Sequence, residues 1–417
     1  PEALTQFIFR CRPRSVGPEP LLDCLQMVSS APRDRYPQNT RYALLLALGE
    51  FTLEEIPVPR REPLLAQLAD WYRNDPRSGV HGAAGWLLRQ WGQADIAREV
   101  DQTPVPYSPD REWFTLAIEV TPTAAPKPQE EPAEKAPGSE PPPSAEKRKP
   151  EEGETAKTDD TGKPEPLAEQ NQPEPPVEPP SKTFYYTFIV FPAGDYTIGS
   201  IGSIDDEPDR GKDETRHPVT LTRPFALLDR EVAFEELIAF SPQYGGLMQR
   251  MDAKPADAGF GPDWYDSVGY CRWLGEQLGL SEADQAYADP AQLDKEKYPR
   301  EPNPSANWAP RNWPIDLGRR GFRLPTESEW EVASRSGART SYGYGSDVNL
   351  LERFGWFREN SGKHVHPPRE LCPSIRGLFD LHGNVFEWTH DWHGVYDVDS
   401  VTDPLGSKGG SNRVLRG

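Results

Sequence analysis

The sequence predicts a protein of the α+β class, in which a small all-helical region precedes a larger domain of short antiparallel strands and long loops. Two observations lead to this class. Apolar residues recur at helical spacing in three early segments, whereas from Phe184 onward aromatic, strand-like segments alternate with Gly turns. A Pro-rich segment separates these two textures. We therefore expect a helical region at residues 1–121, a linker at 122–182 and the strand-and-loop domain at 183–417.

Three amphipathic segments account for the helical prediction, namely residues 41–49 (RYALLLALG), 61–72 (REPLLAQLADWY) and 79–91 (GVHGAAGWLLRQW). Each places apolar residues three or four positions apart and ends at Gly or close to a turn. Joined by short turns that contain Pro, they resemble a HEAT-type array of helical hairpins, which implies a scaffold or adaptor. His81 lies in the third segment, where we expect it to pack against its neighbours without a partner.

The segment 122–182 holds 16 of the 47 Pro residues, 14 acidic and 8 basic side chains, and no aromatic residue. So few apolar groups cannot offset the entropy of ordering the chain, so we expect a disordered tether, with a PxxP ligand as the alternative. A strand-like segment at 112–120 is expected to pair with 184–191 across this tether.

Charge and composition exclude several classes of function. The formal net charge of -20 argues against nucleic acid as a partner, because binding of phosphates requires a basic face. No run of about 18 apolar residues exists, so no membrane span is expected. The 4 cysteines are scattered without metal or disulfide spacing, which is compatible with a reducing compartment such as the cytoplasm.

Three helices are expected in the C-terminal domain, at residues 231–240, 264–278 and 326–334. In the second, Cys271 falls on the apolar face and is expected in the core. The third begins with a capping box, because Thr326 and Glu329 have the spacing that satisfies free backbone N–H groups at a helix start. A pair between Arg323 and Glu327 is expected to fix the preceding loop.

Four motifs in order make the C-terminal domain recognisable: residues 191–200 (FPAGDYTIGS), 207–225 with RHPV at 216–219, 322–330 (FRLPTESEW) and 383–392 (GNVFEWTHDW). Together they resemble the sulfatase-modifying factor family, which comprises the formylglycine-generating enzymes and their relatives. The resemblance covers about 235 residues. It implies a C-type-lectin-like fold of twisted antiparallel strands, held by buried Trp side chains and bound ions.

The fourth motif contains a candidate calcium site. Asn384 and Glu387 supply side-chain oxygens three residues apart, and the carbonyl groups of Gly383 and Val385 complete a cage of hard oxygen ligands. Members of the family hold calcium at this motif, so the resemblance implies that role for these four residues. In the alternative, Asn384 and Glu387 form only hydrogen bonds to the backbone.

A second calcium site of the family has Asn360 and Ser361 as its nearest equivalent here, although the acidic loop that normally follows is missing. His364 and His366 alternate along the same segment, so a strand there would place both imidazoles on one side. No carboxylate motif follows that would support a metal site at this pair.

The resemblance implies oxidation of a substrate-protein cysteine to formylglycine by an enzyme cysteine pair that binds copper. Those cysteines follow an Arg-Gly-Gly-Ser-Trp turn, and this sequence ends at the start of that turn, at Gly417. Cys271 and Cys372 do not occupy the required places. No catalytic residue is therefore assigned, and we expect a piece of a longer chain, since the sequence also begins at Pro1 without Met.

Three functions follow from these observations. The first is a formylglycine-generating oxidase domain whose partner is a protein or peptide, such as a sulfatase-type Cys substrate. The second is a noncatalytic, calcium-stabilised module that binds a protein or a glycan. The third is the variable protein of a diversity-generating retroelement, since those proteins share the fold.

Overall fold

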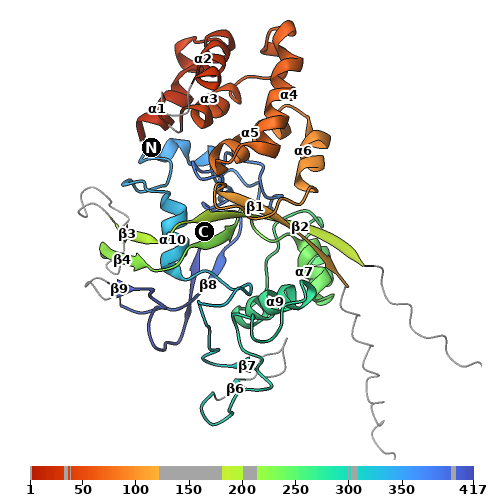
Figure 1. The fold of residues 1–417 in the computed structure, drawn as a ribbon, viewed down its shortest axis with the longest axis vertical. Coiled ribbons are helices and arrows are strands. Elements are labelled where there is room, and N and C mark those ends of the chain that lie inside the picture. Colours follow the sequence, from red (N-terminus) through yellow and green to blue (C-terminus); the bar gives the residue numbers. More distant parts are fainter. Residues whose placement is uncertain are drawn as a thin grey trace, which may run out of the picture. The chain divides into compact units, whose positions relative to one another are not determined.

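The computed structural model describes residues 2–31, 36–37, 39–121, 181–200, 214–298, 300–301, 309–395 and 401–417 (Figure 1). Six helices come first: α1 (Glu2–Arg10), α2 (Pro18–Ser30), α3 (Thr40–Leu48), α4 (Val58–Asn74), α5 (Ser78–Gln90) and α6 (Ala94–Asp101). The later helices are α7 (Phe234–Phe240), α8 (Gln243–Arg250), α9 (Trp264–Gln277) and α10 (Glu327–Arg335). Short 3₁₀ turns lie at Arg12–Arg14, Leu53–Glu55 and Val348–Arg353. No described helix is long and apolar enough to cross a bilayer.

The strands are short and form four small sheets. They are β1 (Trp113–Val120), β2 (Lys182–Phe191), β3 (Gly194–Ile198), β4 (His217–Leu221), β5 (Phe225–Leu228), β6 (Arg300–Glu301), β7 (Ala309–Pro310), β8 (Glu387–Trp392), β9 (Val401–Thr402) and β10 (Arg413–Arg416). The sheet orders are β1-β2-β5, β3-β4-β9, β10-β8 and β6-β7. All pairs are antiparallel except β4 with β9. This mixture of helices and short antiparallel strands confirms the α+β class.

The three helices predicted in the N-terminal region are confirmed as α3, α4 and α5. In α3 every residue from Tyr42 to Leu48 is buried, because neighbouring helices cover it on all sides. Helices α1, α2 and α6 were not predicted. That these helices form a HEAT-type array stays a prediction.

The predicted pairing across the Pro-rich segment is confirmed. Strands β1 and β2 are antiparallel neighbours, with Trp113 opposite Ile189 and Val120 opposite Lys182. The Pro-rich segment therefore connects two adjacent strands of one sheet and does not separate two independent domains. The predicted disorder of residues 122–182 falls on 122–180, which lie outside the described part of the chain, except at its end, where Lys182 is instead the first residue of β2.

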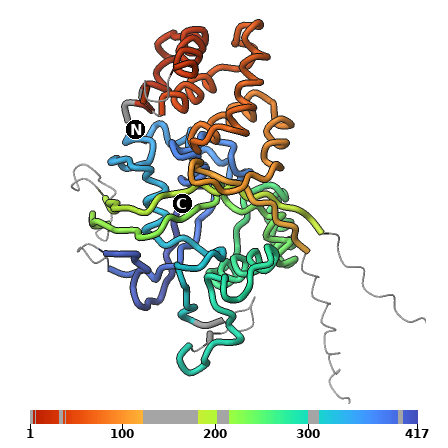
Figure 2. Tube along the Cα trace, in the orientation of Figure 1, coloured from red at the N-terminus to blue at the C-terminus, as the bar shows by residue number. Residues whose placement is uncertain are grey.

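The helical region and the C-terminal domain share one hydrophobic core, which differs from the expected scaffold on a tether. Phe354, Cys372 and Phe379 belong to the same buried cluster as the leucines of α3 and α5. Figure 1 shows α1–α6 on one side of β1 and β2, with α7 and α9 on the other, and Figure 2 shows the blue C-terminal trace running beside the red and orange helices. The contact forms because loops of the C-terminal domain fit directly against α5.

Glycines on α5 permit that fit. A Cβ atom on Gly79 would lie 2.2 Å from the carbonyl oxygen of Ile375, and one on Gly82 would lie 2.9 Å from the Cα of Gly377. Gly377 itself has a φ of 82°, a conformation that favours glycine. Any larger side chain at these α5 positions would push the two regions apart.

The helices predicted in the C-terminal domain are confirmed, with one shifted boundary. Helix α7 begins at Phe234 and not at residue 231, because Glu236 accepts a hydrogen bond from the backbone N–H of Ala233 at 2.6 Å and fixes the helix start there. Glu231 therefore lies before the helix. Its carboxylate is free to reach another loop, which matters for the site described below.

The predicted capping box of α10 is confirmed, but the predicted ion pair beside it is wrong. Thr326 accepts a hydrogen bond from the N–H of Glu329, and the Glu329 side chain accepts one from the N–H of Thr326. Because Glu329 turns back over the helix start, it and not Glu327 meets Arg323, at 2.6 and 2.7 Å. Glu327 instead pairs with Arg416 at 2.8 Å.

Candidate functional site

The turn that carries the fourth motif precedes β8 and is held by its backbone conformation. Gly383 has a φ of 98° and Asn384 a φ of 56°. A Cβ atom on Gly383 would lie 2.0 Å from the carbonyl oxygen of Trp356, so only glycine allows this approach. The N–H of Asn384 donates to that same carbonyl at 2.7 Å. The motif is thus fixed against the loop that contains Trp356.

Asn384 joins three segments through its side-chain amide. Its nitrogen donates to Glu231 Oε2 at 2.6 Å and to the carbonyl of His366 at 3.0 Å, while its oxygen accepts from the N–H of His366 at 2.9 Å. The second oxygen of Glu231 accepts from the N–H of Val385 at 3.1 Å. Asn384 thus bonds the side chain of Glu231 as well as the backbone of His366, so it does more than the backbone-only alternative expected, and the calcium role of this turn stays a prediction.

Three carboxyl groups lie around this turn: Glu231 and Asp380, which are buried, and Glu387, which is half-buried. Burial raises the pKa of Glu387 to about 7, with a further upward contribution from Asp380. Burial also raises the pKa of Asp380 to about 7. The pKa of Glu231 lies well above its usual range, first because of burial and then because of the charges of Asp380 and Glu387. The three groups therefore favour neutralisation, by protons or by a bound cation.

Hydrogen bonds satisfy only part of this carboxyl cluster. Trp330 Nε1 donates to Glu387 Oε2 at 3.1 Å. The N–H of Arg369 donates to Asp380 Oδ2 at 2.8 Å, whereas Asp380 Oδ1 is buried without a hydrogen-bond partner. A buried carboxylate oxygen without a protein partner is unusual.

The structure brings together Gly383, Asn384, Val385 and Glu387, as their proximity in sequence requires. It adds Glu231 and Asp380, which sequence reasoning missed. The signal for Asp380 was its place three residues before Gly383, whereas Glu231 lies 152 residues or more away and nothing in the sequence linked it to the motif. Across the described residues, no group of three or more His, Cys, Asp or Glu side chains is arranged so that it could hold a metal ion.

The residues expected at a second calcium site, Asn360 and Ser361, form hydrogen bonds within a loop. Asn360 accepts from the N–H of Phe357 at 2.7 Å and donates to the carbonyl of Gly355 at 3.0 Å. The carbonyl of Ser361 contacts the Nε2 atom of His366 at 2.9 Å. A metal role for Asn360 and Ser361 stays a prediction.

The expected strand with two aligned imidazoles is wrong. No strand forms around His364 and His366, because this segment is a series of turns that pack on Trp356. The ring of His366 stacks on Trp356 at a centroid distance of 3.7 Å and pairs with Glu370 at 3.4 Å. His364 is exposed instead.

The expectation that His81 lacks a partner is also wrong. Its Nδ1 atom lies 2.6 Å from the carbonyl oxygen of Tyr72, and its ring stacks on Trp113 at 3.7 Å. Burial lowers the pKa of His81 to about 3, so the imidazole is neutral. It is a packed core residue, as its position on a helix suggested.

The four cysteines do not form a reactive pair. Cys271 lies in the core as predicted, and burial raises the pKa of its thiol to about 12. Burial likewise raises the pKa of Cys372 and Cys11. Cys24, on α2, is exposed. All four are free thiols.

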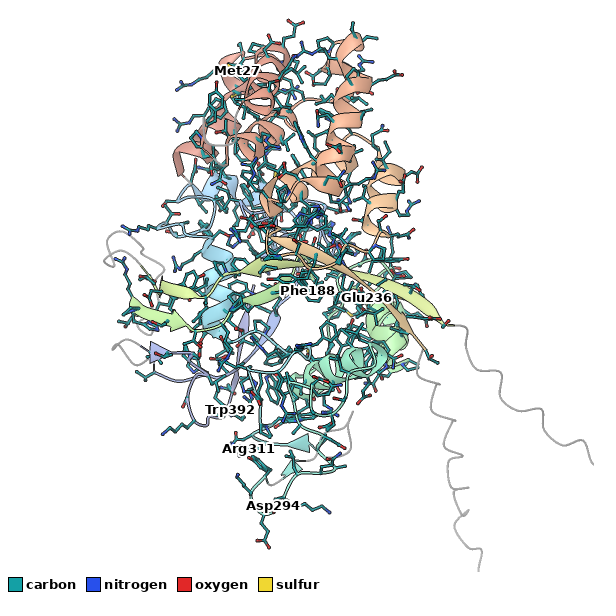
Figure 3. All side chains as sticks on the ribbon, viewed as in Figure 1. Met27, Phe188, Glu236, Asp294, Arg311 and Trp392 are labelled. Carbon is teal, nitrogen blue, oxygen red and sulfur yellow. The ribbon has the colours of Figure 1, made fainter. Side chains whose placement is uncertain are left out.

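Aromatic rings fix the end of the described chain. The guanidinium of Arg413 lies between the rings of Trp264 and Trp392, at 3.6 and 3.7 Å from their centroids. Arg311 stands over the same Trp392 ring at 5.7 Å, and Figure 3 shows the two side by side. These cation–π contacts hold β10 against β8.

The fold and the site together define a class of protein. It is an α+β domain of short strands and long loops, with a Gly-Asn turn beside buried carboxyl groups. The sequence model of the family "Sulfatase-modifying factor enzyme 1-like domain" matches residues 174–417, which is more than half of the chain. The chain belongs to this family.

Similar proteins include formylglycine-generating enzymes. That of Streptomyces coelicolor is 38% identical over 111 residues, which is 23% of this chain and 35% of the enzyme. The serine/threonine-protein kinase pkn1 of Chlamydia pneumoniae is 38% identical over 103 residues, 23% of this chain and 16% of the kinase. Each match thus spans well under two thirds of the relative. Among solved structures, Treponema denticola variable protein 1 aligns with 25% identity and a TM-score of 0.44, covering 56% of this chain and 83% of that one.

Proposed function

We propose that the C-terminal domain is a formylglycine-generating domain that acts on a cysteine-bearing segment of a protein partner. The family match over residues 174–417 carries this proposal, together with the formylglycine-generating enzymes among the relatives. The described cysteines do not fit a copper-binding pair, since Cys271 and Cys372 are buried in different hydrophobic clusters. We assign no reaction step to them. The proposed activity requires thiols from outside residues 1–417.

The test uses the natural gene product at full length. It is incubated with copper, oxygen and a Cys-x-Pro-x-Arg peptide, and an aldehyde-reactive hydrazide reports formylglycine. The control peptide carries Ser in place of Cys. Aldehyde on the Cys peptide alone supports the proposal, whereas no aldehyde from a folded protein loaded with copper contradicts it.

A noncatalytic binding module is the second candidate, because the described thiols are buried or isolated. On this proposal the domain binds a protein or glycan and calcium stabilises it. Retention of the folded protein on a peptide or glycan array, lost after chelation, would support this function. Aldehyde formation in the first assay would exclude it.

The carboxyl cluster supports calcium as the cofactor. Asp380 contributes to the raised pKa of Glu231 and of Glu387, and among the described residues neither Glu231 nor Glu387 forms an ion pair with a basic side chain. The donors at hand are carboxylate and carbonyl oxygens, which calcium prefers. We propose Glu231, Glu387 and the turn 383–385 as the holding groups, with Asp380 supplying charge. A bound calcium ion would neutralise the cluster and stabilise the turn.

Calorimetric titration and thermal unfolding test this site. Calcium at about 100 times its Kd should stabilise the protein by about 2.7 kcal/mol. Glu387→Gln should abolish that gain. The control is Glu359→Gln, which changes an exposed carboxylate in the same way. Equal stabilisation of both variants would contradict the assignment.

A further inference from the structure

A cavity of about 410 Å³ lies between residues 251–257, which follow α8, and residues 364–370. Its two walls are joined because the N–H of Ala258 donates to the carbonyl of His366 at 3.1 Å. The volume falls in the range of small-molecule sites in proteins, about 300 to 1,000 Å³. The turn of residues 383–387 does not line this cavity. The cavity is therefore a second candidate site, with a lining of its own.

Asp257 places a carboxyl group in the wall of the cavity. The residue is only 5% exposed, and its Oδ2 atom accepts a hydrogen bond from the backbone N–H of Lys254 at 2.7 Å. The described residues supply neither a hydrogen bond nor an ion pair to its Oδ1 atom. A buried carboxylate is normally paired with a cation or satisfied by hydrogen bonds. One oxygen of Asp257 is thus available to a ligand that enters the cavity.

The charges along the cavity are mainly negative. Asp252 and Glu370 line it together with Asp257, whereas Lys254 is the basic residue of the lining. Glu370 lies 3.4 Å from the Nδ1 atom of His366, but no ion pair among the described residues joins Lys254 to any of the three carboxylates. A recess lined mostly by one sign of charge attracts the opposite sign. A cationic ligand is therefore favoured over a neutral or an anionic one.

Apolar side chains complete the lining. Val365 and Pro367 flank His366, whose ring is held in place because it stacks on Trp356 at a centroid distance of 3.7 Å. Met251 adds a third apolar side chain and is 54% exposed, although it lines the cavity. A wall that is already fixed lowers the entropy cost of binding. The ligand should therefore carry an aliphatic segment beside its charge.

The single open oxygen distinguishes two kinds of organic cation. A guanidinium prefers a carboxylate that offers both oxygens, whereas an ammonium is a compact point charge. The N–H of Lys254 already occupies Oδ2 of Asp257. We propose that this cavity binds a primary alkylammonium group, whose charge meets Asp257 and whose methylene chain lies on Val365, Pro367 and Met251. A lysine side chain of a partner protein and a free alkylamine both offer this chemistry.

The test titrates the protein with n-pentylamine and with Nα-acetyl-lysine methylamide, which represent the two sources. Methyl NMR resonances of Met251 and Val365 report binding, and 1-pentanol is the uncharged control. Saturable shifts with at least one amine and none with the alcohol support the proposal. Tighter binding of the lysine derivative assigns a partner's lysine, and tighter binding of pentylamine assigns a free amine. No saturable shift with either amine, or equal shifts with the alcohol, overturns it.

A matched pair of variants locates the charge. Asp257→Asn keeps an acceptor for the N–H of Lys254 but removes the negative charge, so amine affinity should fall at least about thirtyfold. Asp110→Asn makes the same change at an exposed position away from the cavity and should leave the affinity unchanged. Equal affinity of the folded Asp257→Asn protein and the wild-type protein would overturn the assignment.

Two changes at exposed residues keep the proposal testable if Asp257→Asn does not fold. Lys254→Gln removes a competing positive charge and should raise amine affinity, whereas Met251→Lys adds one and should lower it. Each change should be about two- to fivefold, as for exposed charges, with Val365 as the NMR reporter. Opposite signs in the two variants support the site, and changes of the same sign or none in both overturn it.

Discussion

The helical region and the C-terminal domain are stabilised in different ways. The helices bury a continuous apolar core in which Leu45, Leu46 and Leu48 are fully enclosed. The C-terminal domain buries apolar rings as well, but it also encloses many carboxyl groups: Asp229, Glu231, Glu236, Asp257, Asp266, Glu327, Glu329, Glu331, Asp380 and Asp391. Asp75 is the only carboxyl group among the buried residues described before β1.

This difference follows from how each region provides hydrogen-bond partners for its backbone N–H and C=O groups. A helix pairs its own N–H and C=O groups, so its interior needs only apolar side chains. Long loops leave backbone N–H groups unpaired, and buried carboxylates accept hydrogen bonds from them: Glu331 accepts from Gly199 at 2.6 Å, and Asp380 from Arg369 at 2.8 Å. Buried acidity is therefore the structural consequence of a loop-rich fold.

The largest effect is expected where the two regions meet. Arg369→Met leaves the buried Asp229 without its guanidinium partner, while the half-buried Asp101 keeps Arg89, so the free energy of unfolding should fall by about 3 to 5 kcal/mol. Urea denaturation measures this loss. Arg98→Met, which breaks an exposed ion pair of α6, should change stability by less than about 0.5 kcal/mol. Similar losses in both variants would mean that Arg369 does not join the regions.

A pair of glycine substitutions sharpens the comparison. Gly79→Ala places a Cβ atom 2.2 Å from the carbonyl of Ile375 and should destabilise the protein by about 1 to 3 kcal/mol. Gly245→Ala, on α8, meets nothing within 4 Å and should stabilise it by about 0.5 to 1 kcal/mol through helix propensity. Thermal unfolding distinguishes the expected loss of stability in the first variant from the expected gain in the second. A gain in both variants would show that α5 does not touch the C-terminal loops.

Acid should act on the helical region through His81. Its pKa of about 3 in the folded protein lies below the ordinary value of 6.5, so as the pH falls the unfolded chain binds the proton first. This residue therefore removes about 1.4 kcal/mol of stability per pH unit between about pH 6 and pH 4. His81→Asn keeps a donor for the carbonyl of Tyr72 but cannot be protonated.

Chemical denaturation at a series of pH values measures that slope. As the pH falls, the variant should lose stability less steeply than the wild-type protein. The difference in slope should correspond to the uptake of about one proton on unfolding. Identical slopes would mean that His81 is accessible to water in the folded state.

The smallest effect concerns helix starts. Thr326→Ala removes the hydrogen bond that Thr326 accepts at the start of α10 and should cost about 1 kcal/mol. Asn39 precedes α3 without any side-chain cap, so Asn39→Ala should cost much less. Denaturant midpoints compare the two. Equal costs would contradict the view that side-chain acceptors matter more in the loop-rich domain.

Much of this molecule was predictable from local sequence. Apolar spacing located α3, α4, α5 and α9, and the capping pair Thr326 and Glu329 fixed the start of α10. The alternation in the two strand-like segments on either side of the Pro-rich segment predicted the pairing of β1 with β2. The four ordered motifs identified the family. These features depend on neighbours within a few residues or on a strong pattern, so a single sequence carries them.

The site was only half predictable. Gly383, Asn384, Val385 and Glu387 are close in sequence, and their chemistry could be read directly. Glu231 reaches them from a different element, and only the tertiary structure reveals that its carboxylate meets both Asn384 and Val385. The error over Arg323 has the same origin, since the choice between Glu327 and Glu329 depends on how the helix start turns in space.

By itself, the sequence determined the class of fold, the family and the turn that carries the site, because helix periodicity, strand alternation and motif order are properties of the chain. Only the tertiary structure decided that the helical region shares a core with the loops of the C-terminal domain, and that Arg369 bridges Asp101 and Asp229. The physical reason is that buried charge pairs form wherever folding brings opposite charges together, and no local pattern records which distant partner a buried charge will meet.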